Sequence, residues 1–109
     1  MSLIVHQVAE QLIDAIAPIA REVQRHDPDL AKQLRRAAQS IVLNIAEAEK
    51  LGDNGNQRVH FERAAGSNGE TRAAMRIASS CGYVDEVVVK RCDRIADSVQ
   101  AMLWKLTHR

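Results

Sequence analysis

The segment from Leu30 to Leu51 carries the strongest hydrophobic pattern in the chain. Its apolar residues recur mostly at steps of three and four, so at about 100° per residue they occupy roughly a third of a helix surface. Such a stripe needs a neighbouring helix to cover it. Asp27 and Pro28 are suited to begin this helix, and Gly52 is suited to end it. We therefore predict a helix over 28–51 that buries Leu30, Leu34, Ala37, Ala38, Ile41, Ile45 and Ala48.

Segments before and after this one have the same periodicity. Pro18 lies inside the first, at about 3–25, where it removes a backbone donor and crowds the carbonyl of Asp14. This predicts a kink near Pro18, and a break into two shorter helices is the alternative. The last segment, 86–107, follows Asp85 as a cap and is expected to bury Val88, Cys92, Ile95, Val99, Met102 and Leu106.

The third segment, from Asn56 as a cap to about Cys81, has the thinnest stripe and contains Gly66 and Gly69. Each glycine costs about 1 kcal/mol relative to alanine inside a helix. Either a turn interrupts the segment there, or the helix is continuous and small residues let a neighbour approach closely. The surrounding alanines and the lack of proline favour a continuous helix. Its expected core residues are Val59, Phe61, Ala64, Ala65, Met75, Ile77 and Ala78.

The composition agrees with helices packed on helices. Only 3% of the 109 residues are aromatic, so alanine and aliphatic side chains must fill the core. The length suits one domain, 1–109. Four helices with short loops predict an all-α, antiparallel up-down-up-down four-helix bundle. With no long apolar run, no signal peptide and two cysteines, we expect a cytoplasmic protein without membrane contact.

A short turn near Asp53 makes the second and third helices antiparallel neighbours. Positions whose numbers sum to about 107 then lie at the same height, so Ser40 is level with Ser67 and Asn44 with Arg63. Buried polar groups need partners, so a hydrogen-bonded network of structural role is expected along this line. Its predicted members are Arg35, Arg36, Ser40, Asn44, Glu47, Arg63, Ser67 and Glu70, with Arg35 or Arg36 reaching Glu70 and Glu47 reaching Arg63.

Two large apolar residues point away from the predicted core. Leu43 lies about 180° from the stripe of its helix, and Trp104 lies about 150° from that of the last helix. Single exposed apolar residues are common, but a tryptophan and a leucine on outer faces together favour contact with another subunit. Leu43 and Trp104 are therefore candidate residues of an oligomer interface.

The charge is nearly balanced, with 15 basic and 14 acidic residues, which is atypical of a protein that grips a nucleic-acid backbone. A solvated or salt-bridged face is the favoured interpretation of the arginines. Repeated around an oligomer, they could still form a basic stripe. The candidate nucleic-acid contacts are Arg21, Arg25, Lys32, Arg58, Arg72 and Arg76.

Motifs for catalysis or metal binding are lacking in the sequence. No glutamate has a histidine three residues later, as di-iron bundles require, and there is no Cys-x-x-Cys. His6 with Glu10, and Glu22 with His26, have the spacing of surface pairs. The segment 66–69 lacks the lysine of a phosphate loop. We predict neither an enzyme nor a metal or cofactor site.

The chain resembles the four-helix-bundle family named after proteins encoded in 23S ribosomal RNA intervening sequences. The resemblance rests on 34–47 (LRRAAxSIxxNIAE, where x is any residue), Phe61, 64–67 (AAGS), Glu70 and 82–83 (GY). It implies a bundle that assembles into a ring, most commonly a homopentamer. A related protein is the accessory protein of diversity-generating retroelements, a basic pentamer that binds a reverse transcriptase and nucleic acid; this chain lacks that basicity.

Three functions remain as hypotheses. The first is a non-enzymatic, oligomeric scaffold or adaptor of unassigned role. The second is an accessory protein of nucleic acid or of a ribonucleoprotein. The third, and the least supported, is an enzyme whose site lies at a subunit boundary.

Overall fold

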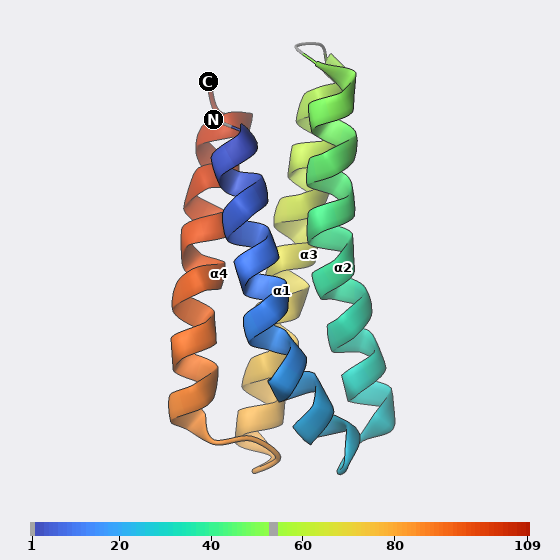
Figure 1. Cartoon of the computed structure of the whole chain (residues 1–109), viewed down its shortest axis with the longest axis vertical. Helices are drawn as coiled ribbons and strands as arrows, with labels where there is room; N and C mark the ends of the chain where they lie inside the picture. The colour runs from blue at the N-terminus through green and yellow to red at the C-terminus, as the bar shows by residue number, and fades with distance from the viewer. Residues whose placement is uncertain (1, 53–54) are drawn as a thin grey trace.

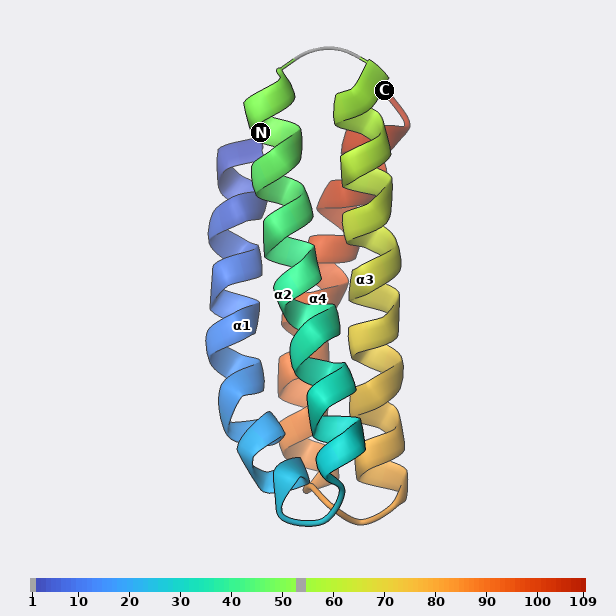
Figure 2. The same ribbon diagram turned by 90° about the vertical axis from the view of Figure 1, so that its right-hand side faces the viewer.

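The chain forms four α-helices in a computed structural model that describes residues 2–52 and 55–109. They are α1 (Ser2–Gln24), α2 (Pro28–Leu51), α3 (Gly55–Ser80) and α4 (Glu86–Thr107), and the described residues include no strand. The helices alternate in direction, each contacts the next, and α1 closes against α4 (Figures 1 and 2). The fold is therefore the predicted up-down-up-down bundle, with α1 and α3 on one diagonal and α2 and α4 on the other.

Side-chain caps and glycines set the helix ends. Asp27 accepts a hydrogen bond from the Leu30 backbone at 3.0 Å, and Asp85 accepts one from the Val87 backbone at 2.8 Å, so both predicted caps are confirmed. Gly82 lies in the turn that follows α3 and has φ 75°, a conformation that glycine adopts without strain. The predicted turn residues Asp53 and Asn54 lie outside the described residues. α3 begins at Gly55, one residue before the predicted cap Asn56.

The predicted stripe of α2 is confirmed in full, since all seven residues are buried in the core together with Ala31. α1 buries one face as well, and Val8 beside it is only partly buried; the buried residues are Val5, Ala9, Leu12, Ile16, Ile19, Ala20 and Val23. α1 is one helix through Pro18, and its axis bends in its last turns, drawn in lighter blue in Figures 1 and 2. The missing donor and the crowded ring explain this bend without a break.

The predicted faces of α3 and α4 need correction. α4 buries Val89, Ala96 and Leu103, each one residue after the expected Val88, Ile95 and Met102. Cys92, Val99 and Leu106 belong to both stripes, so the sequence spacing cannot distinguish these two faces. A hydrogen bond from Asn68 to the Ala96 carbonyl draws the Ala96 side toward α3. On α3, the expected core residues Val59 and Ile77 are 42% and 50% exposed, and Asn68 and Thr71 are buried instead.

The glycines do not interrupt α3, which runs continuously from Gly55 to Ser80. Gly66 and Gly69 are exposed, and a Cβ atom placed at either would meet nothing within 4 Å. Within one chain, they therefore do not serve the close approach of a neighbouring helix.

Among the described residues, no helix is both long and apolar enough to cross a membrane.

We expect Gly66→Ala and Gly69→Ala each to raise the free energy of unfolding by about 0.5–1 kcal/mol, because alanine fits the open space and restricts the unfolded chain. Urea unfolding followed by circular dichroism measures the change. The matched control is Gly82→Ala, where φ is 75° and we expect destabilisation of about 1 kcal/mol. Destabilisation by the first two substitutions would contradict the open helix face.

Candidate functional site

A line of polar side chains joins α2 to α3. The Ser40 and Ser67 hydroxyls lie 2.7 Å apart, which places these two residues at the same height, as the turn predicted. The Asn44 amide donates to the Ser40 hydroxyl at 3.0 Å and to its carbonyl at 2.9 Å. His60 Nδ1 lies 3.2 Å from the amide oxygen of Asn44, which can only accept, so Nδ1 carries the proton. We call Ser40, Asn44, His60 and Ser67 the α2–α3 polar line.

Only part of the predicted network takes part in this line. His60 was missed, although it lies seven residues before Ser67 and so shares its helix face. Arg63 is turned outward by roughly 60° from His60 and is exposed. In the described part of the chain, no hydrogen bond or ion pair joins Arg63 to Glu47.

The predicted partners of Glu70 also differ. Arg36 and Glu70 line the same shallow cleft between α2 and α3, but nothing in the described structure bonds them to each other. Arg35 faces α1 instead, and its guanidinium donates to Gln24 at 2.8 Å. The two arginines are adjacent in sequence, so about 100° of helix rotation separates them and only one can face α3.

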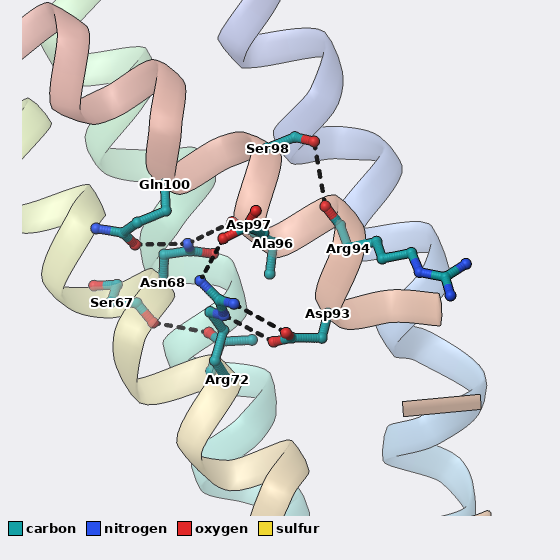
Figure 3. Close-up of polar contacts among 10 residues, drawn as sticks. Ser67, Asn68, Arg72, Asp93, Arg94, Ala96, Asp97, Ser98 and Gln100 are labelled. Atoms are coloured by element: carbon teal, nitrogen blue, oxygen red, sulfur yellow. Dashed lines mark hydrogen bonds and ion pairs between the residues drawn. The ribbon is translucent and has the colours of Figure 1, made fainter. Parts of the chain in front are cut away.

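A second polar cluster between α3 and α4 was not predicted. Asn68 is fully buried, and its amide donates to the Ala96 carbonyl at 2.9 Å and to the Gln100 side chain at 2.8 Å (Figure 3). The amide oxygen of Asn68 has no partner in the described structure. We call Asn68, Arg72, Asp93, Asp97 and Gln100 the α3–α4 cluster. The spacing of four between Asp93 and Asp97 was the signal in the sequence that could have revealed it.

Arg72 supplies the charged part of this cluster. It donates two hydrogen bonds to Asp93, at 2.7 and 2.9 Å, and a longer one to Asp97 at 3.4 Å (Figure 3). The hydrogen bond from Arg72 is the main reason that the pKa of Asp93 is lowered. The same hydrogen bond raises the pKa of Arg72, because Asp93 stabilises the charged guanidinium. A forked, partly buried pair of this kind is among the stronger charged contacts in proteins.

This pairing affects the predicted nucleic-acid contacts. Arg72 is held by Asp93, Arg58 by Glu62 at 2.9 Å, and Arg25 by Glu22 at 3.5 Å. Arg72 therefore joins α3 to α4, and its pairing leaves it less available to a phosphate than an unpaired arginine; its role as a nucleic-acid contact stays a prediction. The other three candidates are exposed and make no ion pair with the rest of the described chain; they are Arg21, Lys32 and Arg76.

His6 connects α1 to α2. Its imidazole lies 2.8 Å from Glu49 of α2 and also contacts Glu10, its predicted partner on α1. Burial opposes protonation and is the largest single influence, but the hydrogen bonds to Glu49 and Glu10 together outweigh it and raise the pKa of His6. The predicted pair of His26 with Glu22 is longer, at 3.6 Å, and the His26 ring also stacks on Tyr83.

The two candidate interface residues are strongly exposed. The exposed fraction is 67% for Leu43 and 59% for Trp104, and they belong to the diagonal helices α2 and α4. The Trp104 ring stacks on His108, with 4.2 Å between the ring centres.

No group of three or more His, Cys, Asp or Glu side chains is placed to hold a metal in the described part of the chain. Burial raises the pKa of the Cys92 thiol to about 11, so it remains protonated at neutral pH.

Comparison with known proteins agrees with the geometry of this bundle. The sequence profile of the 23S rRNA-intervening sequence proteins matches residues 1–105. The chain belongs to this family. The family resemblance seen in the sequence is thereby confirmed, and it now covers α1 and most of α4 as well as the segment 34–83.

A solved structure has the same fold. It is the crystal structure of a protein of unknown function from the S23 ribosomal protein family of Bacteroides thetaiotaomicron. The TM-score is 0.89 at 16% identity, over 96% of this chain and 99% of the other. At this identity the likeness supports the fold of the present chain and says nothing about the activity of either protein. None of the curated proteins matches the chain.

We expect the link through His6 to make the stability of the bundle depend on pH. Folding raises the pKa of His6 above its ordinary value of 6.5, so the stabilisation is complete below that pH and is lost as the pH rises through the folded-state pKa. Urea unfolding between about pH 6 and pH 8 should show this loss. His6→Gln should flatten the profile over this window, and Glu49→Gln should reduce its slope. An unchanged profile in His6→Gln would contradict this role.

Proposed function

We propose that this protein is a non-enzymatic scaffold or adaptor that acts as a homo-oligomer. One observation carries the proposal: Leu43 and Trp104 present large apolar side chains to solvent from diagonal helices. Exposing such groups is unfavourable unless another surface covers them, and exposed apolar patches mark interaction sites. Because the two residues lie on different faces, one copy offers contact surfaces to two neighbours.

The polar groups of the bundle support a binding role over a catalytic one. His6, Arg72 and Asp93 have perturbed pKa values, and a partner on a neighbouring helix contributes to the shift of each of them. Perturbed groups occur at active sites and also in structural ion pairs. Here they connect α1 to α2 and α3 to α4, so their role is to hold the helices in place.

We further propose that the assembly is a ring of five copies in the cytoplasm. The number five is what the resemblance to the family implies. The cytoplasmic location is supported by two free cysteines, Cys81 on the surface and Cys92 in the core, because reduced thiols persist in that compartment.

A nucleic-acid or ribonucleoprotein accessory role is the second candidate. The observation that favours it is the placement of Arg21 and Lys32, which are exposed near the α1–α2 corner without an acidic partner in the described structure. A ring would repeat this pair around its circumference. The ion pairs of Arg25, Arg58 and Arg72 reduce the number of basic groups left for phosphates, so we rank this function below the first.

The mass in solution tests the first proposal. Light scattering coupled to size exclusion should give a defined multiple of the 12.1 kDa chain mass, and a fivefold multiple for the proposed ring. A stable interface should survive dilution to micromolar concentration. A protein that remains at the single-chain mass there would refute the homo-oligomer.

A gel shift tests the second candidate. If the protein binds nucleic acid through its arginines, structured RNA or DNA should shift at about 50 mM salt and be released as salt rises. The double substitution Arg21→Gln with Lys32→Gln should weaken the shift, whereas Arg58→Gln, whose arginine is paired with Glu62, should weaken it less. Absence of any shift at the lowest salt would exclude this function.

A further inference from the structure

A shallow, mainly apolar cleft lies between α1 and α2, and Leu43 is one of its lining residues. Its volume is about 540 Å³, within the range of clefts that admit a small ligand, about 300–1,000 Å³. A smaller cleft of about 240 Å³ shares two of its lining residues and continues along the same two helices. We call the larger one the α1–α2 cleft; it is lined by Glu10, Ile13, Asp14, Gln39, Val42 and Leu43.

Trp104 lies on the opposite side of the bundle. Asp97 precedes it by seven residues, so the two share a face of α4, and Asp97 contacts Arg72 of α3. Trp104 is therefore on the α3 side of α4, whereas the cleft is lined by residues of α1 and α2. Within one chain, the indole of Trp104 therefore cannot reach the α1–α2 cleft.

The indole is already held in position. His108 stacks on it, and the imidazole Nδ1 also lies 2.9 Å from the Trp104 carbonyl and 3.0 Å from the Thr107 hydroxyl. A side chain that is ordered before binding loses less conformational entropy when it is buried in an interface. Tryptophan is also one of the residue types that most often dominate the binding energy of an interface.

The geometry points to a head-to-tail contact between copies, in which Trp104 of one chain inserts into the α1–α2 cleft of the next and packs against Leu43. This inference rests on the proposed homo-oligomer and identifies its interface. The partner is a second copy of this chain. Leu43 and Trp104, the two most exposed large apolar residues, then cover each other.

The charges around the two surfaces are complementary. Asp14, together with Glu10, which also contacts His6, gives the cleft an acidic edge. Lys105 and Arg109 flank Trp104 and make no ion pair within the described chain, while Asp97 on the same face is held by Arg72. A basic surface around the tryptophan thus meets an acidic edge, which favours this pairing over contact between two identical clefts.

The position of the two surfaces determines the type of assembly. A contact between two different faces is heterologous, so it adds further copies in the same sense and closes into a ring when the rotation allows. Two clefts facing each other would instead form an isologous pair and stop at a dimer. Trp104 plays no part in such an isologous pair, so Trp104→Ala would still dimerise if the clefts faced each other.

Two variants that each remove one side of the contact provide the test. Trp104→Ala leaves the cleft intact, and Leu43→Glu leaves the tryptophan intact. Both side chains are largely exposed, so we expect both variants to fold, with unchanged circular dichroism and a cooperative unfolding transition whose midpoint falls only by the stabilisation that assembly supplies. Each alone should be monomeric, with self-association weakened roughly 30-fold or more, as is usual for a dominant interface residue. The matched control Ile77→Glu, at an exposed residue of α3, should assemble as the wild type does.

The decisive measurement is the mass of a one-to-one mixture of the two variants. The intact tryptophan of Leu43→Glu should occupy the intact cleft of Trp104→Ala, which gives a heterodimer that cannot extend. If the mixture stays monomeric, or if Trp104→Ala alone assembles normally, the inference is overturned while the homo-oligomer stands. If the wild type is itself monomeric, both the proposed function and the inference fail.

Discussion

The burial of the α2 stripe is the interaction on which the rest of the structure depends. Leu34, Ile41 and Ile45 are fully buried, and they place α2 between α1 and α3. A helix with one apolar face can bury it only against neighbouring helices, and short loops then fix their alternating direction. With few aromatic residues, close packing of alanine and aliphatic side chains supplies the stability of this core.

Polar contacts then determine the register and rotation of the helices on this apolar core. The α2–α3 polar line aligns Ser40 with Ser67, and Asn68 fixes which side of α4 meets α3. Such contacts contribute little net free energy, but leaving a buried polar group unpaired is costly. If α4 were rotated differently about its axis, the amide hydrogens of Asn68 would be left unpaired in the core. The polar groups therefore select one arrangement among several with similar apolar burial.

Much of the fold could be predicted from the sequence, but less of the polar site. Local sequence determines the α2 stripe and the bend at Pro18. The short turn between α2 and α3 determines that Ser40 and Ser67 lie at the same height. The partners of Arg35 and Arg72 do not, because a long side chain can reach several neighbours. Which one it meets depends on helix rotation, and the rotation of α4 was ambiguous between two stripes that share Cys92, Val99 and Leu106.

The sequence by itself determined four amphipathic helices, their order and the outward direction of Leu43 and Trp104, since these follow from periods of 3.6 residues and from caps. Only the tertiary structure decided that Trp104 lies on the α3 side of α4 and that a cleft opens beside Leu43 between α1 and α2. The reason is physical: a periodic pattern specifies the direction of a side chain relative to its own helix axis. Its neighbours depend on how the helix is rotated in the bundle, which the packing of all four helices determines together.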